Sequence, residues 1–472
     1  MTDAGWSKRL QTIGDAAILG RAFVKNWALA GRMVLSRGPL EMRRRINRFA
    51  WLKTVAASPN DLPARFTKGR HGLYREAVAY LTSEAAGTFI TSIDEHFRHP
   101  ERSILHEDLI PSELFAGMGL TPWMAELLGI MVPLLSPSLG ESYIDAAENA
   151  GIPPDTCSLP KVTLGLALSD DLPPPVAMVS CNMPCDGGMN SYTLMQKKYG
   201  VPAFRLDIPY NFYSERAEDY FVGELKRLIA WLETNTKGRM DWDRMREVCE
   251  ERNRAVELET ELWDLISRRP APMAAEPVYF SHLLYMCAFP GRPESTAVFR
   301  KIVEITKKIA ASGRGALENE KYRTVLWNPP TLSCADLWVW AEAEFGVANI
   351  MDMLTYNRQP FIDTKSPETM LKGLARIIMQ GPMARHTRGP AENFFSDLFS
   401  LYERFDLDMI WMAGHIGCKN TMALNGMFRE KCRKRGIPLL IINYDLADRR
   451  IVPPSEVREQ VSRFMETVAR RS

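Results

Sequence analysis

Two short apolar runs, each followed by a cysteine and then by a helical pattern, constrain the fold of this chain more than any other feature. The first run, 175–180, is introduced by consecutive prolines and is followed directly by Cys181. The second run, 408–413, leads through a glycine-containing loop to Cys418. A helical pattern and a further apolar run follow each of them, which is the strand–helix–strand order of a parallel sheet. The chain is therefore expected to contain α/β units with cysteines at the carboxyl ends of strands.

The same reading divides the chain into four regions. They are a helical N-terminal region (1–108), a first α/β domain with Cys157 and Cys181 (109–235), a helical connector (236–320) and a second α/β domain with Cys418 (321–472). A chain of 472 residues that is 46% hydrophobic can bury more than one core. The expected fold class is α/β, with two doubly wound (Rossmann- or flavodoxin-like) domains that face each other across a cleft, a helical N-terminal cap and a helical connecting segment.

Charge and cysteine content exclude several classes of protein. The net charge of +2 argues against a general nucleic-acid binder, although residues 1–75 hold 15 Lys and Arg against 4 Asp and Glu. This basic opening is expected to be a solvated helical face, with an acidic partner as the alternative. The apolar stretch 16–35 is interrupted by basic residues, so it suits a docked helix better than a membrane surface, and no transmembrane segment is expected. Eight cysteines in a long chain without an apolar leader indicate a reduced, cytoplasmic protein.

Cysteines that are far apart in sequence but lie at strand ends indicate a soft-metal or iron–sulfur site, because ligands collect at the carboxyl ends of parallel strands. Cys181 and Cys185 form a CxxxC pair, a weak signal by itself, and Cys181 is favoured since it closes the strand. Cys418 lies at or just before a helix N-terminus, a position that favours thiolate. His415, three residues earlier, is a candidate for proton transfer, although a lone histidine is more often structural.

Other motifs give no competing chemistry. The remaining cysteines, Cys249, Cys287, Cys334 and Cys432, occupy ordinary helical or apolar positions. The chain has no HExxH, no Walker P-loop, no dinucleotide-binding fingerprint in a strand–helix context and no GxSxG. A structural zinc site with thiolates from Cys157, Cys181, Cys185 and Cys418 remains an alternative.

Several segments in order resemble the large subunit of the 2-hydroxyacyl-CoA dehydratases, whose relatives include the ATP-dependent benzoyl-CoA reductases. The segments are DTCS at 155–158, CNMPC at 181–185, YGVP at 199–202, LDIPYN at 206–211, HIGCK at 415–419, GIP at 436–438 and DLADR at 445–449. The resemblance covers about residues 110–472. It implies that Cys157, Cys181 and Cys418 bind a [4Fe–4S] cluster, with Cys185 as the alternative to Cys181. One corner of the cluster is then left to a ligand other than cysteine.

The resemblance also implies partners and a reaction. Members of this family act as heterodimers of related subunits, and a separate ATP-hydrolysing iron–sulfur activator delivers one low-potential electron. The dehydratases use it for radical elimination of water from a 2-hydroxyacyl-CoA, and the reductases transfer electrons to an aromatic ring. The leading expectation is a dehydratase subunit, a lyase. A benzoyl-CoA-type reductase subunit and a non-catalytic iron–sulfur redox protein are the alternatives. The basic N-terminal region is a candidate for docking the activator or the phosphates of CoA.

Overall fold

The structure, a computed structural model, describes residues 38–210, 214–327, 332–352, 354–356 and 360–470, together with isolated positions between 20 and 35. The stretch 16–35, expected to form a docked helix, lies largely outside the described residues.

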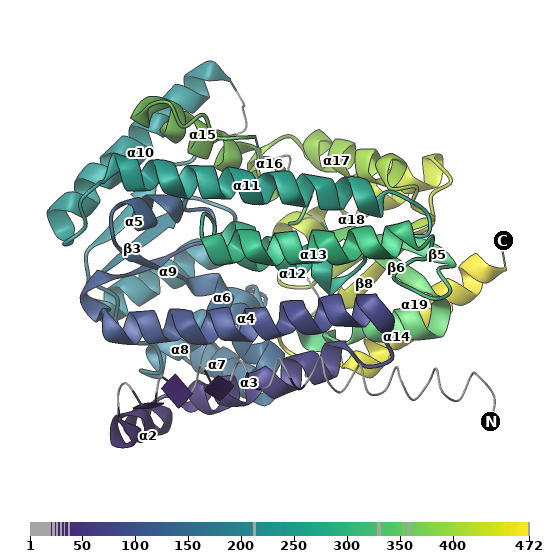
Figure 1. Cartoon of the computed structure of the whole chain (residues 1–472), viewed down its shortest axis with the longest axis horizontal. Helices are drawn as coiled ribbons and strands as arrows, with labels where there is room; N and C mark the ends of the chain where they lie inside the picture. The colour runs from purple at the N-terminus through teal and green to yellow at the C-terminus, as the bar shows by residue number, and fades with distance from the viewer. Residues whose placement is uncertain are drawn as a thin grey trace.

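Two four-stranded parallel sheets form the centre of the described chain, with the orders β2-β1-β3-β4 (sheet A) and β6-β5-β7-β8 (sheet B). Sheet A consists of β1 (Ser103–His106), β2 (Thr121–Met124), β3 (Ala177–Cys181) and β4 (Ala203–Leu206). Sheet B consists of β5 (Tyr322–Trp327), β6 (Val347–Asp352), β7 (Met409–His415) and β8 (Leu439–Tyr444). Helices surround both sheets, which confirms the predicted class of two doubly wound α/β units (Figure 1).

Burial explains why the central strands are recognisable as continuous apolar runs. β3 and β7 are buried at every position, as expected for parallel strands that are covered on both faces. The edge strand β8 instead alternates between more and less buried positions. The pairing register aligns Cys181 with Leu206 and His415 with Tyr444, so the ends of neighbouring strands lie at the same edge of each sheet.

The expected limit of the helical N-terminal region needs one correction. β1 lies within residues 1–108 and is a central strand of sheet A, paired with both β2 and β3. It has only four residues, all buried, so it shows neither the length nor the alternation that identifies a strand in sequence. The first α/β unit therefore begins before residue 109.

The helices fall into groups that follow the chain. The N-terminal group is α2 (Pro39–Arg48), α3 (Ala50–Phe66) and α4 (Gly72–Arg98), followed by the short η1 (Pro100–Arg102). Sheet A is accompanied by α5 (Glu113–Gly117), α6 (Ala125–Leu135), α7 (Pro137–Asn149), α8 (Ser158–Leu168), α9 (Asp186–Tyr199) and α10 (Glu215–Asn235). The connector holds α11 (Trp242–Ile266), α12 (Glu276–His282), η2 (Leu283–Ala288) and α13 (Pro293–Ala311). Sheet B is accompanied by η3 (Leu332–Cys334), α14 (Leu337–Phe345), α15 (Pro367–Gln380), α16 (Pro382–Arg388), α17 (Ala391–Arg404), α18 (Lys419–Lys434) and α19 (Pro454–Ala469).

Long helices hold the two sheets in one body. α4, α13 and α11 lie side by side and cross in front of both sheets in Figure 1. The start of α11 is fixed by a cap: the carboxylate of Asp241 accepts the N–H groups of Asp243 and Arg244. Among the described residues, no helix is both long enough and apolar enough to cross a membrane.

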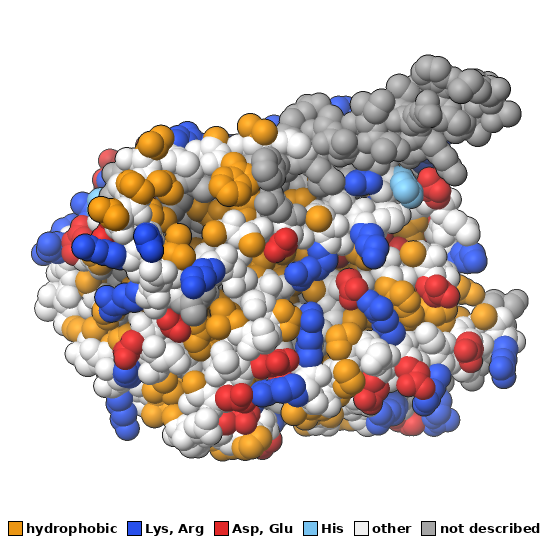
Figure 2. All heavy atoms as spheres, turned by 90° about the horizontal axis from the view of Figure 1, so that it is seen from below, with side chains coloured by type: hydrophobic (Ala, Val, Ile, Leu, Met, Phe, Trp, Pro, Cys, Tyr) orange, Lys and Arg blue, Asp and Glu red, His pale blue; other side chains and the backbone are white. Residues whose placement is uncertain are grey.

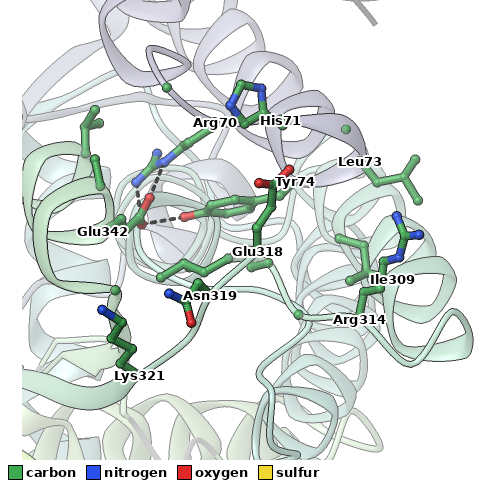
Figure 3. A pocket seen from close by; sticks show the side chains of 18 of the residues that line it. Arg70, His71, Leu73, Tyr74, Ile309, Arg314, Glu318, Asn319, Lys321 and Glu342 are labelled. Carbon is green, nitrogen blue, oxygen red and sulfur yellow. Dashed lines mark hydrogen bonds and ion pairs between the residues drawn. The ribbon is translucent and has the colours of Figure 1, made fainter. Parts of the chain in front are cut away.

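A buried ion-pair network fastens the N-terminal helices to the second sheet. Arg70, which lies just before α4, donates two hydrogen bonds of 2.7 Å to the Glu342 carboxylate on α14 and one to Glu276 on α12. The hydroxyl of Tyr74 donates to the same Glu342 carboxylate at 2.8 Å (Figure 3). The two carboxylates raise the pKa of Arg70 well above its usual value despite burial, so the guanidinium stays charged. The network lines a cavity of about 530 Å³ beside Lys321 and Gly346, at the amino ends of the sheet B strands.

The surface seen from below in Figure 2 shows positive and negative side chains interspersed, with basic side chains gathered on the side where α2 lies. Arg43, Arg44 and Arg48 of α2 are exposed there. These arginines of α2 therefore form a solvated helical face, whereas Arg70 of the same basic opening is buried.

Candidate functional site

The carboxyl ends of both sheets border one cavity of about 470 Å³. Sheet A contributes residues that follow β1, β2 and β3, and sheet B contributes residues at the ends of β7 and β8. The lining residues with polar or sulfur-containing side chains include Glu107, Asp108, Glu126, Cys157, Cys185, His415 and Cys418. Strand order reverses between β1 and β3 and again between β5 and β7, so each sheet has a topological switch point at this edge. The cavity thus lies where open α/β sheets bind ligands.

Three cysteines line this cavity, and each occupies the residue position directly before a helix. Cys157 precedes α8, Cys185 precedes α9 and Cys418 precedes α18. All three are partly buried free thiols. A helix N-terminus carries unpaired N–H groups and the positive end of the helix dipole, which stabilise thiolates and bound anionic groups. In α9 the N–H of Gly188 donates to the sulfur of Cys185 at 3.5 Å. Two sheets therefore direct three thiols and three helix N-termini at one cavity.

Cys181 lies apart from this group. It closes β3, is fully buried, and its thiol donates to the carbonyl oxygen of Met183 at 3.1 Å. Its backbone N–H donates to the Glu107 carboxylate at 2.7 Å. Among the described residues that line the cavity, Cys185 is present and Cys181 is not. The structure therefore brings together Cys157, Cys185 and Cys418, and places Cys181 in the core beneath sheet A's loops.

Burial and repulsion between thiolates oppose the ionisation of Cys157 and Cys185. Burial raises the pKa of Cys157 well above its usual value, and the nearby Cys185 and Cys418 thiols raise it further. Burial also raises the pKa of Cys185 to about 11, with a smaller contribution from Cys418, although the Gly188 N–H acts in the opposite direction. Three thiolates in one cavity consequently need a cationic group to balance them. A soft metal ion or an iron–sulfur cluster satisfies this need, since both prefer thiolate ligands.

His415 is held against one of the three cysteines. The ring is fully buried at the end of β7, and its Nε2 lies 3.1 Å from the sulfur of Cys157. The backbone N–H of Leu446 donates to Nδ1 at 3.0 Å, so Nδ1 carries no proton in the neutral ring. Burial lowers the pKa of His415, which keeps the ring neutral. The neutral ring therefore carries its proton on Nε2 and donates it to Cys157.

Close backbone contacts join the two sheets at this point. A Cβ atom at Gly417 would lie 2.6 Å from the Cα atom of Cys157, so only glycine fits there. The side-chain amide of Asn420 donates to the carbonyl oxygen of Pro184 at 3.2 Å, and the Ala447 N–H donates to the Ser158 hydroxyl at 3.2 Å. Each of these contacts pairs a residue from the sheet A unit with one from the sheet B unit. The thiols from the two units are therefore held in a fixed relation.

Three carboxyl groups that the sequence analysis did not single out share the cavity. One oxygen of each of Glu107, Asp108 and Glu126 lies within 4.8 Å of the others, and the Tyr192 hydroxyl donates to Glu126. Burial raises the pKa of Glu126 to about 8, with repulsion from Asp108 adding to it. Burial raises the pKa of Asp108 to about 6, and burial together with the other two carboxyl groups raises that of Glu107 well above its usual range. This cluster can hold and exchange protons near neutral pH.

A sequence signal for the carboxyl cluster exists but is faint. Glu107 and Asp108 follow β1 directly, and Glu126 lies one residue into the helix that follows β2. Because β1 has no recognisable strand pattern, the sequence alone does not show that Glu107 and Asp108 follow a strand. Lys419 is exposed, and its ammonium nitrogen lies 3.6 Å from the Asp155 carboxylate, so it acts here as a surface ion-pair partner.

Comparisons with known proteins identify the family of this chain. The chain matches the family described as 2-hydroxyglutaryl-CoA dehydratase, D-component, over residues 109–468. Lactoyl-CoA dehydratase subunit alpha of Anaerotignum propionicum is 18% identical over 356 residues, which are 68% of this chain and 81% of the relative. Similarity also extends to the (R)-2-hydroxyisocaproyl-CoA dehydratase alpha subunit of Clostridioides difficile, at 22% identity over 43% of this chain and 52% of the relative.

A benzoyl-CoA reductase subunit of Thauera aromatica is 27% identical over 216 residues, 41% of this chain and 49% of the relative. The chain thus spans most of the lactoyl-CoA relative and about half of the other two. These findings confirm the resemblance seen in the sequence motifs. Since the family match covers well over half of its length, this chain belongs to the 2-hydroxyglutaryl-CoA dehydratase D-component family, a family of 2-hydroxyacyl-CoA dehydratase subunits.

Proposed function

We propose that this protein is the cluster-binding subunit of a 2-hydroxyacyl-CoA dehydratase and that Cys157, Cys185 and Cys418 hold a [4Fe–4S] cluster. The observation that carries the proposal is the convergence of three thiols at helix N-cap positions, from both sheets, on one cavity. Cys185 takes the place that the sequence analysis favoured for Cys181, because the Cys181 thiol is fully buried and donates to Met183. Family membership supports the same reaction class.

The donor set suits the cluster. Three thiolates leave one of the four irons of a cubane without a cysteine ligand. When bound, such a cluster supplies a low-potential electron and a Lewis-acidic iron. His415 would donate its Nε2 proton to the Cys157 sulfur, and hydrogen bonds of this kind tune cluster potential. The N-termini of α8, α9 and α18 would stabilise the negative charge of the thiolate-ligated cluster.

The carboxyl cluster would serve proton transfer in the same cavity. Removing water from a hydroxyacyl thioester requires that one carbon lose a proton and that the leaving hydroxyl gain one. The raised pKa values of Glu126, about 8, and of Asp108, about 6, lie on either side of neutral pH. A group whose pKa is close to the working pH is the most effective general acid or base. We assign proton holding to this pair and cluster binding to the cysteines.

Substrate and partners follow from the proposed reaction. The substrate class is a 2-hydroxyacyl-CoA. A second, related subunit is expected, since the dehydratase relatives are named as alpha subunits. The chain itself has no Walker P-loop, so ATP-driven electron supply falls to a separate iron–sulfur activator.

Iron and acid-labile sulfide content of anaerobically purified protein tests the proposal. About four of each per chain, with a brown visible spectrum, are expected for one cubane. Turnover of 2-hydroxyacyl-CoA substrates with activator, ATP and partner subunit would then identify the reaction. A colourless protein that takes up no cluster even with its partner subunit present would overturn the proposal, and zinc in its place would favour a structural zinc site.

A benzoyl-CoA-type aromatic reductase subunit is the second candidate function. The specific observation in its favour is the 27% identity to the benzoyl-CoA reductase subunit of Thauera aromatica. Ring reduction of an aromatic acyl-CoA, with no turnover of 2-hydroxyacyl-CoA substrates, would favour it. A cluster-containing protein that binds neither class of CoA thioester would instead be a redox protein without an acyl-CoA substrate.

A further inference from the structure

A second, smaller cavity adjoins the one that holds the three thiols. Its volume is about 90 Å³, and Asp108 and Met383 line both cavities. Leu109 and Ile110, which follow β1, and Met124, which ends β2, also line it. The smaller cavity therefore lies at the carboxyl edge of sheet A, next to the carboxyl cluster.

Apolar side chains form most of the wall of the smaller cavity. Leu374, Ile377 and Ile378 lie on one face of α15, because they are spaced three and four residues apart, and all three are buried. The π-helical turn η2 contributes Met286 and the partly buried thiol of Cys287. An apolar wall of this kind favours an apolar occupant, since burying a polar group without a partner is costly.

Charged side chains in and behind the wall are matched in pairs. The Nε of Arg252 lies 2.6 Å from the carboxylate of Glu113, and both side chains line the cavity and are buried. His282 also lines the cavity, and its Nδ1 lies 2.7 Å from the Glu259 carboxylate on α11. Burial opposes ionisation of His282, but Glu259 raises its pKa well above the usual value, so this pair is also charged. A carboxylate in the cavity would compete with Glu113 or Glu259 for these cations and lie beside Asp108, whereas an uncharged chain disturbs neither pair.

The size of the cavity limits the length of such a chain. An apolar cavity of about 150 Å³ in a protein core holds benzene, so one of about 90 Å³ has room for about three or four carbon atoms. Met383 lines both cavities, is partly buried and packs against both hydrophobic cores. Its unbranched, flexible side chain can change rotamer and let a chain pass from the larger cavity into the smaller one.

We propose that the smaller cavity binds the acyl side chain of the 2-hydroxyacyl-CoA substrate and selects an uncharged aliphatic chain of about three or four carbon atoms. In this binding mode, which rests on the proposed function, the thioester and the carbon that bears the hydroxyl lie in the larger cavity with the three thiols. The acyl chain then extends past Asp108 and Met383. Cys287 on η2 and Ile377 on α15 limit its length.

Turnover of three substrates by the cluster-loaded enzyme, with its partner subunit, activator and ATP, tests this assignment. Lactoyl-, 2-hydroxyhexanoyl- and 2-hydroxyglutaryl-CoA carry a methyl, a butyl and a carboxyethyl side chain. The kcat/KM for 2-hydroxyhexanoyl-CoA is expected to exceed each of the other two at least about tenfold, since a few buried methylene groups give discrimination of this order. Equal values, or a preference for lactoyl- or 2-hydroxyglutaryl-CoA, would overturn the assignment and leave the proposed function intact. Turnover of none of the three by an enzyme that holds its cluster would overturn both.

Two variants change the size of the cavity in opposite directions. Cys287→Leu fills part of it and should lower the ratio of kcat/KM for 2-hydroxyhexanoyl-CoA to that for lactoyl-CoA at least about tenfold. Ile377→Ala enlarges it and should raise kcat/KM for 2-hydroxyoctanoyl-CoA, relative to 2-hydroxyhexanoyl-CoA, by about fivefold or more. Iron content shows that each variant is folded, and if Cys287→Leu does not fold, Ile377→Ala decides.

Met379→Ala is the matched control on α15. Met379 is partly buried and is not among the described residues that line either cavity, so both ratios should stay at their wild-type values. Unchanged ratios in folded Cys287→Leu and Ile377→Ala would contradict the assignment. Equal shifts in Met379→Ala would attribute the effect to general loosening of α15 and contradict it as well.

Discussion

Sheets A and B have corresponding strand orders, so their strands can be compared one by one. β3 and β7 occupy equivalent places, and each is followed by a short loop, a cysteine and a helix. The cysteine before the helix is Cys185 in one case and Cys418 in the other. The residue that closes the strand is Cys181 in sheet A and His415 in sheet B. The comparison teaches that the thiols which line the cavity directly precede helices. The residues that close the two strands lie behind these thiols.

The same comparison shows where the sheets differ in chemistry. β1 and β2 of sheet A are followed by Glu107, Asp108 and Glu126. Burial raises the pKa of Asp108 to about 6 and that of Glu126 to about 8, and it raises that of Glu107 well above its usual range. Of the equivalent strands in sheet B, β5 ends at Trp327 and β6 at Asp352. Sheet A therefore contributes two cavity thiols and three carboxyl groups. Sheet B contributes one thiol and a neutral histidine. The shared topology determines at which edge of each sheet the side chains lie. The residues in the loops determine the chemistry of these side chains.

The equivalence of Cys185 and Cys418 predicts the largest effects of substitution, which are losses of bound iron. Cys185→Ser and Cys418→Ser are each expected to lose most of their bound iron, because serine is a poor replacement for a thiolate ligand. Cys181→Ser should keep its iron, since the Cys181 thiol is directed to Met183 within the core. Iron and sulfide analysis with visible spectra measures this. Cys432→Ser, in the buried part of α18, is the control for loss of an unrelated thiol.

The opposite pattern would break the comparison. If Cys181→Ser empties the site and Cys185→Ser does not, the strand end rather than the helix start supplies the ligand.

The difference in carboxyl groups predicts an effect on stability. A carboxyl group whose pKa is higher in the folded state stabilises the fold below its unfolded pKa, and this contribution is lost as pH rises through the folded value. For Glu126 that window runs from 4.5 to about 8, and for Asp352 from 3.8 to about 6. Glu126→Gln should therefore gain stability over the wild type across its window, by up to about 4 kcal/mol. The gain in stability of Asp352→Asn over the wild type should be smaller, and it should reach its full size by about pH 6.

Urea unfolding at pH values below, within and above these windows measures both effects. The exposed Glu344 supplies a control, Glu344→Gln, that should follow the wild type at every pH. A Glu126→Gln profile parallel to that of the wild type would show that the Glu126 carboxyl does not titrate in this range.

Much of the architecture is accessible from sequence, for a physical reason. β3 and β7 are buried on both faces and therefore appear as unbroken apolar runs, and the helices after them have clear polar faces. The family resemblance follows from motifs at these strand ends. β1 escapes prediction because four fully buried residues give no pattern to detect.

The carboxyl cluster and the choice of cysteine need the fold. Glu107 and Glu126 meet because β1 and β2 are neighbours in sheet A, a non-local relation that neither residue shows in its own segment. Cys181 and Cys185 are four residues apart, and only the start of α9 at Asp186 distinguishes the core residue from the cap. A comparison of both cysteines with Cys418, aligned on helix starts, would have indicated Cys185.

The glycines that follow β3 and β7, Gly188 in the first turn of α9 and Gly417 in the loop before α18, also predict unequal tolerance to a methyl group. A Cβ atom at Gly417 would lie 2.6 Å from the Cys157 backbone, so Gly417→Ala should lower the free energy of unfolding by about 1–3 kcal/mol and reduce iron content. At Gly188 the nearest atom is the Glu107 carboxylate at 3.3 Å, and Gly188→Ala should cost less than about 1 kcal/mol.

Gly426 in α18 is the matched control, because nothing lies within 4 Å of its Cβ position. Gly426→Ala should stabilise the protein by about 0.5–1 kcal/mol, as alanine does in a helix interior. Equal losses in Gly188→Ala and Gly417→Ala, measured by urea unfolding, would mean that the two positions are equally crowded.

The smallest expected effect is that of replacing His415, the residue that closes β7, on the midpoint potential of the cluster. In His415→Asn the side-chain oxygen can replace Nδ1 as acceptor for the Leu446 N–H, but the donor to Cys157 is lost. In His415→Gln the longer amide can instead replace Nε2 as donor. Loss of one such hydrogen bond costs about 0.5–1.5 kcal/mol, so both variants should fold and keep iron. Because a donor to a ligating sulfur stabilises the reduced cluster, His415→Asn should have a lower midpoint potential than His415→Gln. Redox titration with visible spectra measures this difference. Equal potentials in the two variants would leave His415 with a purely structural role, like that of Cys181 at the other strand end.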